Sequence, residues 1–268
     1  MRVKTRNRSR KRNKKGIYIL PSLFTSCCLF GGFYAIIAAI QGRYDAAAIA
    51  ILIAAIFDGL DGKIARFAKA TSQFGAEYDS LSDLVAFGVA PGLLAFEWSL
   101  KPFGRFGWLA VFLYIICGAL RLARFNIQKN DLESRHFKGL PIPAAAIFIA
   151  TLVLFINFLG GLTENKHAVI ISTIYLLSFL MVSTIDYLSF KELELFKQKP
   201  FNALVATILL FIVVAYKPPL MLFLFSTMYV ISGPAITLYH RARRRAKTTI
   251  PTMNSAPAKS EKSFEGNL

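Results

Sequence analysis

Residues 56–91 read IFDGLDGKIARFAKATSQFGAEYDSLSDLVAFGVAP and hold four aspartates, at positions 58, 61, 79 and 83, with strongly apolar sequence on both sides. A carboxylate at bilayer depth costs about 3 kcal/mol or more unless it is paired, hydrated or bound to a cation. Intramembrane acidic residues are therefore functional candidates. Four of them within 26 positions predict that a positive group is held between them.

The composition places these aspartates in a membrane protein. The chain has 268 residues, of which 55% are hydrophobic, and a mean hydropathy of +0.49. Its apolar residues form eight blocks: 21–40, 46–57, 84–100, 109–120, 141–160, 168–185, 203–216 and 219–239. A spanning helix needs about 20 residues. The three short blocks reach that length if block 46–57 extends to about 68, block 84–100 begins at about 74, and block 109–120 extends to about 124. We predict an all-α, polytopic membrane protein with about eight transmembrane helices.

The positive charges predict the orientation of these helices. The net charge is +17, with nine Lys or Arg in residues 1–15 and five in residues 241–247. The second, fourth and sixth interhelical connections are also richer in Lys and Arg than the others. The positive-inside rule then places both termini and the aspartates on the cytoplasmic side. We interpret the basic tails as a topology signal that attracts anionic lipid, and we expect no nucleic-acid partner.

The same pattern predicts the domain organisation. Residues 1–15 form a basic arm that we expect to be disordered, with the first helix starting at about Ile17. Residues 16–247 form one membrane domain. Residues 248–268 have no apolar period, and we expect a disordered C-terminal tail.

The spacing of the aspartates predicts a metal site. Asp58 and Asp61 lie about 60° apart on one helical face, and Asp79 and Asp83 are one turn apart. If the two helices pack antiparallel, both pairs can face one cavity. The three cysteines lie inside apolar segments without a CxxC motif, and the three histidines are scattered. Oxygen-only ligands suit Mg²⁺ or Mn²⁺. Two such ions can bind a phosphoryl group during in-line displacement.

Small and basic residues beside the carboxylates have two interpretations each. Gly59, Gly62 and Gly75 can serve close helix packing or leave room for a bulky ligand. Arg66 can bind a phosphate bidentately or extend to the membrane interface.

The segment 58–83 fits the pattern D-x2-D-G-x2-A-R-x8-G-x3-D-x3-D without a mismatch. In this respect the chain resembles the CDP-alcohol phosphatidyltransferases. The segments YDSLSDLVAFGVAP, RLARFN and FKGLPIPAAA resemble the phosphatidylserine synthase branch of that family, so that the resemblance spans about residues 20–146. Ser22 departs from this branch, which often has Asn at that position.

The resemblance implies a CMP-releasing transfer from CDP-diacylglycerol to L-serine, in an integral membrane protein of the bacterial inner membrane. It implies a homodimer and an active site that faces the cytoplasm. Asp83 would be both a metal ligand and the general base. The remaining implied metal ligands are Asp58, Asp61 and Asp79, and the implied CDP-binding residues are Gly62, Ala65, Arg66 and Gly75.

The acceptor's binding residues are a separate hypothesis. L-Serine is zwitterionic, so its carboxylate needs a cation. Arg121, Arg124 and Lys138 lie in segments that can close over the site. Their alternative role is topology alone.

Other functions compete with this one. A sister transferase would use glycerol 3-phosphate, inositol (or its phosphate) or choline. A cation or proton transporter would also need intramembrane carboxylates, although these usually spread over several helices. A membrane scaffold gives no reason for four aspartates.

Overall fold

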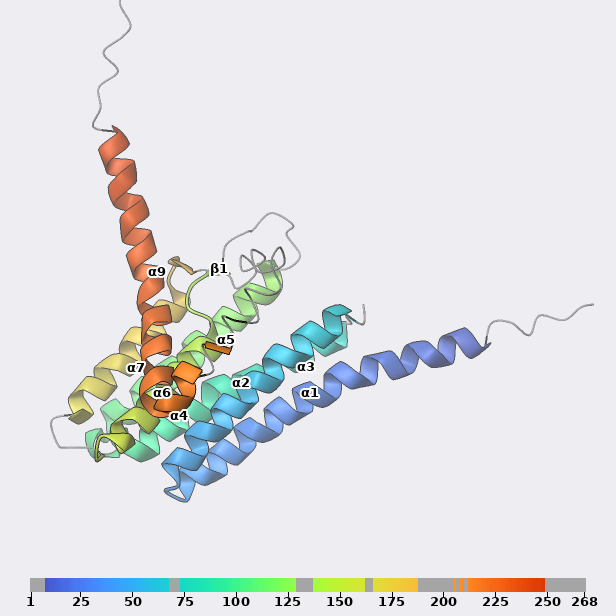
Figure 1. Cartoon of the computed structure of the whole chain (residues 1–268), viewed down its shortest axis with the longest axis horizontal. Helices are drawn as coiled ribbons and strands as arrows, with labels where there is room; N and C mark the ends of the chain where they lie inside the picture. The colour runs from blue at the N-terminus through green and yellow to red at the C-terminus, as the bar shows by residue number, and fades with distance from the viewer. Residues whose placement is uncertain are drawn as a thin grey trace, which may run out of the picture.

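The computed structural model describes the backbone of residues 8–67, 73–128, 137–161, 166–187, 205, 208, 209 and 212–248. Side chains at 8–21, 65–67, 128, 137–138, 166, 186 and 238–248 lie outside the described ones. Figure 1 shows a bundle of long helices, from which the first and last helices project. We call the end of the bundle at which α2 ends and α3 begins the aspartate end.

The first two helices form a hairpin. α1 (Arg8–Ile40) and α2 (Tyr44–Phe67) are joined by a short turn, in which Gly42 has a φ of +73°. Their contact is rich in alanine, and a Cβ added to Gly31 would lie 3.1 Å from the Ala54 Cβ. Small residues of this kind let two helix backbones approach closely, which is how membrane helices gain packing energy.

The third span changes its helical geometry along its length. It runs continuously over Gln73–Phe103 as α3 (Gln73–Asp83), the π-helix η1 (Leu84–Val89), α4 (Ala90–Ala95), the π-helix η2 (Phe96–Leu100) and the 3₁₀-helix η3 (Lys101–Phe103). Gly32 of α1 lies against η1, because a Cβ added there would be 2.6 Å from the Ala86 Cα. The Tyr114 hydroxyl donates to the Phe87 carbonyl over 3.0 Å. Single π-turns occur often at functional sites, and η1 starts directly after Asp83.

The remaining helices complete the bundle. They are α5 (Arg105–Gln128), α6 (Ile142–Phe158), α7 (Lys166–Val182) and α9 (Pro218–Thr248). β1 (Phe137–Lys138) and β2 (Asp186–Tyr187) form a two-residue antiparallel bridge between the segments that precede α6 and follow α7. Gly139, with a φ of +83°, donates its N–H to the Ile185 carbonyl over 2.8 Å. We call residues 137–140 and 183–187 together the strap.

The helical membrane architecture predicted from the sequence is confirmed. Four helices among the described residues are long and apolar enough to cross a membrane: Ser22–Ile40, Gln73–Phe103, Arg105–Ile127 and Pro218–Thr237. Ile142–Phe158 and His167–Val182 are shorter apolar helices. The total of eight and the cytoplasmic position of both termini stay predictions.

One boundary was predicted wrongly. α1 begins at Arg8, nine residues before the expected start at Ile17, so residues 8–15 are helical and not part of a disordered arm. Lys and Arg are good helix formers, and a helix that has already nucleated in the span extends into such a segment at little cost. Residues 1–7 and the tail residues 249–268 lie outside the described ones.

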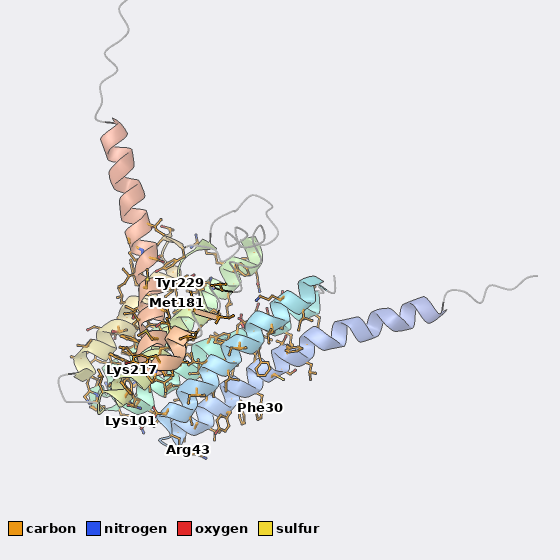
Figure 2. All side chains as sticks on the ribbon, viewed as in Figure 1. Phe30, Arg43, Lys101, Met181, Lys217 and Tyr229 are labelled. Atoms are coloured by element: carbon orange, nitrogen blue, oxygen red, sulfur yellow. The ribbon has the colours of Figure 1, made fainter. Side chains whose placement is uncertain are left out.

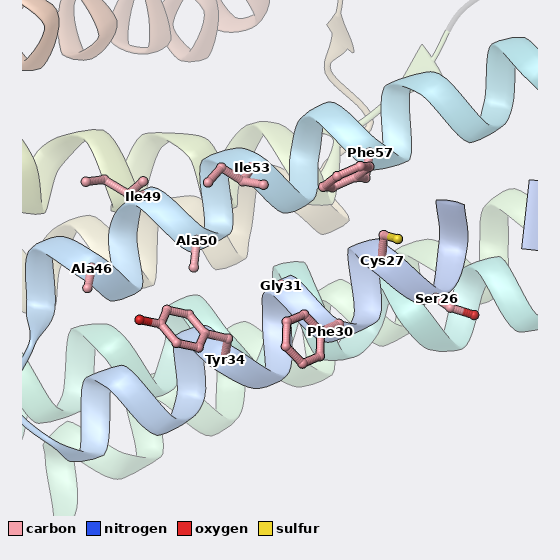
Figure 3. A pocket seen from close by; sticks show the side chains of 10 residues that line it. All are labelled: Ser26, Cys27, Phe30, Gly31, Tyr34, Ala46, Ile49, Ala50, Ile53 and Phe57. Atoms are coloured by element: carbon pink, nitrogen blue, oxygen red, sulfur yellow. The ribbon is translucent and has the colours of Figure 1, made fainter. Parts of the chain in front are cut away.

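An apolar groove of about 600 Å³ lies between α1 and α2 (Figure 3). Apart from Ser26 and the hydroxyl of Tyr34, its lining is apolar, as expected of a surface that contacts lipid chains. The lining residues are Ser26, Cys27, Phe30, Gly31, Tyr34, Ala46, Ile49, Ala50, Ile53 and Phe57.

Candidate active site

Three of the four predicted aspartates converge. Asp58 and Asp61 come from the last turns of α2 and Asp79 from α3, and one carboxylate oxygen of each lies within 4.8 Å of the other two. Asp61 is buried, with 4% of its surface exposed, and the other two are half-buried. Carboxylates this close repel each other unless a cation lies between them. The cluster can therefore hold a metal ion, and its oxygen ligands suit a hard divalent cation.

Asp83 lies one turn further along α3 and is not part of this group of three. Its carboxyl group interacts with that of Asp58. Its Oδ1 atom is buried and has no hydrogen-bond partner among the described residues. Buried polar atoms are nearly always paired in native proteins, so an unpaired carboxylate oxygen beside a metal-binding cluster indicates a place for a ligand.

Hydrogen bonds from helix α1 support the aspartate cluster. Thr25 donates its hydroxyl to Asp61 Oδ2 over 3.0 Å, in a buried contact. Ser82 in turn donates its hydroxyl to the backbone carbonyl of Thr25 over 3.1 Å, which ties α3 to the same turn of α1. Further out, the hydroxyls of Ser26 and Tyr78 lie 2.9 Å apart. These hydroxyl groups hold the aspartate-bearing helices together and fix the direction of one carboxylate.

Thr25, Ser26 and Ser82 were not predicted as site residues from the sequence. A signal was present, because Thr25 and Ser26 lie within the apolar block 21–40. Hydroxyl groups in a membrane helix usually bond to their own backbone or to a neighbouring helix. The sequence does not say which neighbour they face, so their role in the site required the packing of α1 on α2 and α3.

Of the predicted basic residues, the structure brings Arg121 to the site. Asn126 donates to the Ser80 hydroxyl over 2.9 Å and thereby fixes α5 beside α3 at the aspartate end. Arg121, deeper in α5, is close enough to interact electrostatically with Asp83 and with Tyr229 of α9. Its Nε atom is buried and, among the described residues, has no hydrogen-bond partner. Of the three basic candidates, Arg121 is therefore the one for which the structure gives an interaction with a motif aspartate.

The structure describes less of the surroundings of the other two basic candidates, Arg124 and Lys138. Arg124 is half-buried on α5, nearly one turn closer to the end of that helix. The backbone of Lys138 pairs with Asp186 in the strap, but its side chain lies outside the described ones.

The predicted CDP-binding residues surround open space where they are described. A Cβ added to Gly59 or Gly62 would meet nothing within 4 Å. Gly75 is half-buried in the first turn of α3, one turn before Asp79. The side chains of Ala65 and Arg66 lie outside the described ones. A side chain at either position would thus enter open space among the described residues, which favours the interpretation that the glycines of α2 leave room for a ligand.

The chain is similar to proteins of known family. A family profile described as CDP-alcohol phosphatidyltransferase matches residues 18–185. A CDP-diacylglycerol–serine O-phosphatidyltransferase of Helicobacter pylori is 40% identical over 218 residues, which cover 81% of this chain and 90% of the relative. The enzyme of the same name from Bacillus subtilis is 36% identical over 65% of this chain and 92% of its own. An archaetidylserine synthase of Methanothermobacter thermautotrophicus is 37% identical over 63% and 69%.

The matched residues 18–185 include the whole aspartate motif, the helices α2 and α3 that carry it, the helix α5 beside α3, and the α1 turn that supports Asp61. The extent of this match and the identity to the relatives show that the chain belongs to the CDP-alcohol phosphatidyltransferase family.

Proposed function

We propose that the chain is a phosphatidylserine synthase, which transfers the phosphatidyl group of CDP-diacylglycerol to the hydroxyl of L-serine and releases CMP. The observation that carries the proposal is the convergence of Asp58, Asp61 and Asp79 beside the unpaired Asp83 oxygen. The names of the relatives support serine as the acceptor.

The carboxylate cluster fits the divalent ions that this reaction needs. Asp58, Asp61 and Asp79 would hold Mg²⁺ or Mn²⁺, and Asp83 would share in a second ion. When bound, such ions neutralise the charge of the diphosphate and of the departing phosphate. The ligand set supports a hard cation, because all its donor atoms are carboxylate oxygens.

Asp83 acts as the general base in this proposal. A serine hydroxyl is a weak nucleophile at neutral pH, so a carboxylate must accept its proton as it attacks. The serine oxygen forms a bond to the phosphorus that carries diacylglycerol, the bond from that phosphorus to the CMP oxygen breaks, and the proton moves to Asp83. Gly62, Ala65, Arg66 and Gly75 line the CDP pocket, and the open space at Gly62 supports this assignment.

Cationic side chains at the same end bind the carboxylate of serine. Arg121 has the strongest support, because this half-buried residue lies near Asp83 and its Nε atom is buried and unpaired among the described residues. Arg124 and Lys138 complete the set, from the last turns of α5 and from the strap.

We further propose that the protein is a homodimer in the bacterial inner membrane, with residues 16–247 as the membrane domain and the active site facing the cytoplasm. The excess of Lys and Arg near the aspartate end supports this orientation.

The test uses the full chain in detergent with CDP-diacylglycerol, Mg²⁺ or Mn²⁺ and one acceptor at a time. The acceptors are L-serine, glycerol 3-phosphate, inositol and choline, CMP release is measured, and the lipid product is identified by mass spectrometry. We expect phosphatidylserine from L-serine and little product from the others. Preferential use of another alcohol would instead indicate a sister transferase.

A pair of variants tests the general base. Asp83→Asn should lower kcat by about 10²–10⁴-fold, the usual contribution of a general base. Glu77→Gln removes an exposed carboxylate from the same helix and should leave kcat unchanged. An Asp83→Asn enzyme with the wild-type kcat would overturn the role of Asp83.

A further inference from the structure

The apolar groove between α1 and α2 ends close to the aspartate cluster. On α2 its lining follows one helical face at intervals of three and four residues, through Ala46, Ala50, Ile53 and Phe57 (Figure 3). Asp61 lies one turn beyond Phe57 on this face, about 6 Å further along the helix axis. Since Asp61 belongs to the carboxylate cluster, the same face of α2 carries both the groove and a candidate metal ligand.

Helices α1 and α3 meet the groove at the same end. Ser26 lines it and directly follows Thr25, whose hydroxyl donates to Asp61. The Ser26 hydroxyl lies 2.9 Å from the hydroxyl of Tyr78, which precedes Asp79 of the cluster. The groove and the carboxylates are therefore joined through residues of three helices that are hydrogen-bonded or adjacent in the chain.

The groove has the size and lining expected for one hydrocarbon chain. Small residues such as Gly31 and Ala50 line its middle, next to the larger Ile53 and Phe30. Phe30 lies on the outside of the bundle (Figure 2) and is 67% exposed, so the groove is open to lipid. From Ala46 to Phe57 the lining extends about 16 Å at about 1.5 Å per residue. This length is about the hydrocarbon thickness of one leaflet, half of the about 30 Å of a bilayer.

We propose that the groove binds one acyl chain of CDP-diacylglycerol while the diphosphate of the same molecule lies at the aspartate cluster. The inference rests on the proposed function, since it names a subsite for the lipid substrate. Carboxylates alone repel a phosphate, whereas divalent ions bound to them attract it. A lipid whose phosphate is held there brings its chains to the end of the groove at Ser26 and Phe57. An ordinary bilayer lipid, whose phosphate lies elsewhere, is not placed in this way.

The experiment maps the position of the acyl chain by photolabelling. The probe is CDP-diacylglycerol with an alkyl diazirine at the end of one palmitoyl chain. The full chain in lipid nanodiscs is mixed with the probe and Mn²⁺ without an acceptor and irradiated, and the labelled residues are identified by mass spectrometry. A phosphatidylcholine with the same diazirine chain measures the labelling by ordinary lipid.

Two variants accompany the wild type. Ile53→Trp places an indole in the middle of the groove. Ile56→Trp makes the same change on the same helix, at a 62% exposed residue that does not line the groove, and is the matched control.

We expect the label at the end of the groove remote from the aspartates, on Tyr34, Ala46 or Ile49, and an excess of unlabelled CDP-diacylglycerol should remove it. Ile53→Trp should lower this labelling about fivefold, which corresponds to the loss of about ten van der Waals contacts between the chain and the groove. Ile56→Trp should be labelled like the wild type, and the phosphatidylcholine probe should label these residues far less.

Labelling of other helices, or no labelling because a second copy of the chain covers the groove, would overturn the proposal. Equal labelling by the phosphatidylcholine probe would show that the groove holds ordinary bilayer lipid, and a label that Ile53→Trp leaves unchanged would also contradict the subsite. CMP release with L-serine is measured on the same preparation. Turnover without a label in the groove would refute the subsite alone, whereas a wild type that releases no CMP would refute the proposed function.

Discussion

The hydrogen bond from Thr25 to Asp61 permits a sharp test of the site. Thr25→Val keeps the shape of the side chain and removes the hydroxyl that donates to Asp61 Oδ2 over 3.0 Å. The backbone carbonyl of residue 25 remains, so Ser82 keeps its own hydrogen bond to α1. The substitution therefore separates the support of one carboxylate from the packing of α1 on α3.

The expected magnitude follows from the burial of this bond. A hydrogen bond to a charged group contributes about 1.5–3 kcal/mol, which corresponds to about 10–100-fold in an equilibrium constant. Groups that orient a metal ligand typically change metal affinity by the same factor of about 10–100. Since Asp61 is buried, water does not replace the lost donor. We therefore expect the apparent Kd for Mn²⁺ to rise by about 10–100-fold.

The assay titrates Mn²⁺ into the full chain in detergent and measures binding by calorimetry and CMP release in parallel. Thr173→Val is the matched control, because the Thr173 hydroxyl donates over 2.8 Å to the Val169 carbonyl of its own helix α7. The control should keep the wild-type Kd. If Thr25→Val also binds Mn²⁺ within twofold of the wild type, Asp61 is either not a metal ligand or not positioned by α1.

Three further predictions concern packing, open space and charge. Gly32→Ala should lower the melting temperature, because its Cβ would lie 2.6 Å from the Ala86 Cα. Gly59→Ala is the control and should keep the wild-type melting temperature, because its Cβ would meet nothing within 4 Å. Equal melting temperatures for the two variants would contradict the close contact of α1 with η1. Gly62→Leu should leave thermal stability intact but raise the KM for CDP-diacylglycerol at least tenfold, and an unchanged KM would mean that the nucleotide lies elsewhere. Mn²⁺ at 100 times its Kd should stabilise the wild type by about 2.7 kcal/mol, and Asp79→Asn should abolish this stabilisation. Without metal, Asp79→Asn should raise the melting temperature, because it removes a charge that repels Asp61. A chelator-treated variant that is no more stable than the chelator-treated wild type would argue against that repulsion.

Much of the aspartate site follows from local geometry. Spacings of three and four residues place Asp58 with Asp61, and Asp79 with Asp83, on common helical faces before any packing is known. The antiparallel return of the chain then brings the two pairs to the same end of the bundle. The structure confirms this convergence for Asp58, Asp61 and Asp79. Helical spacing alone did not separate Asp83 from the other three aspartates, and its distinct role as general base came from the family resemblance.

The sequence determined by itself that this protein is a helical membrane protein with clustered intramembrane carboxylates, because hydrophobicity and helical period act over a few neighbouring residues. Tertiary structure alone decided that Thr25 supports Asp61, that Ser82 ties α3 to the same turn of α1, and that Asn126 joins α5 to α3. These contacts join residues far apart in the chain. They depend on how each helix is rotated and how deep it sits against its neighbours, and side-chain packing between whole helices sets both quantities.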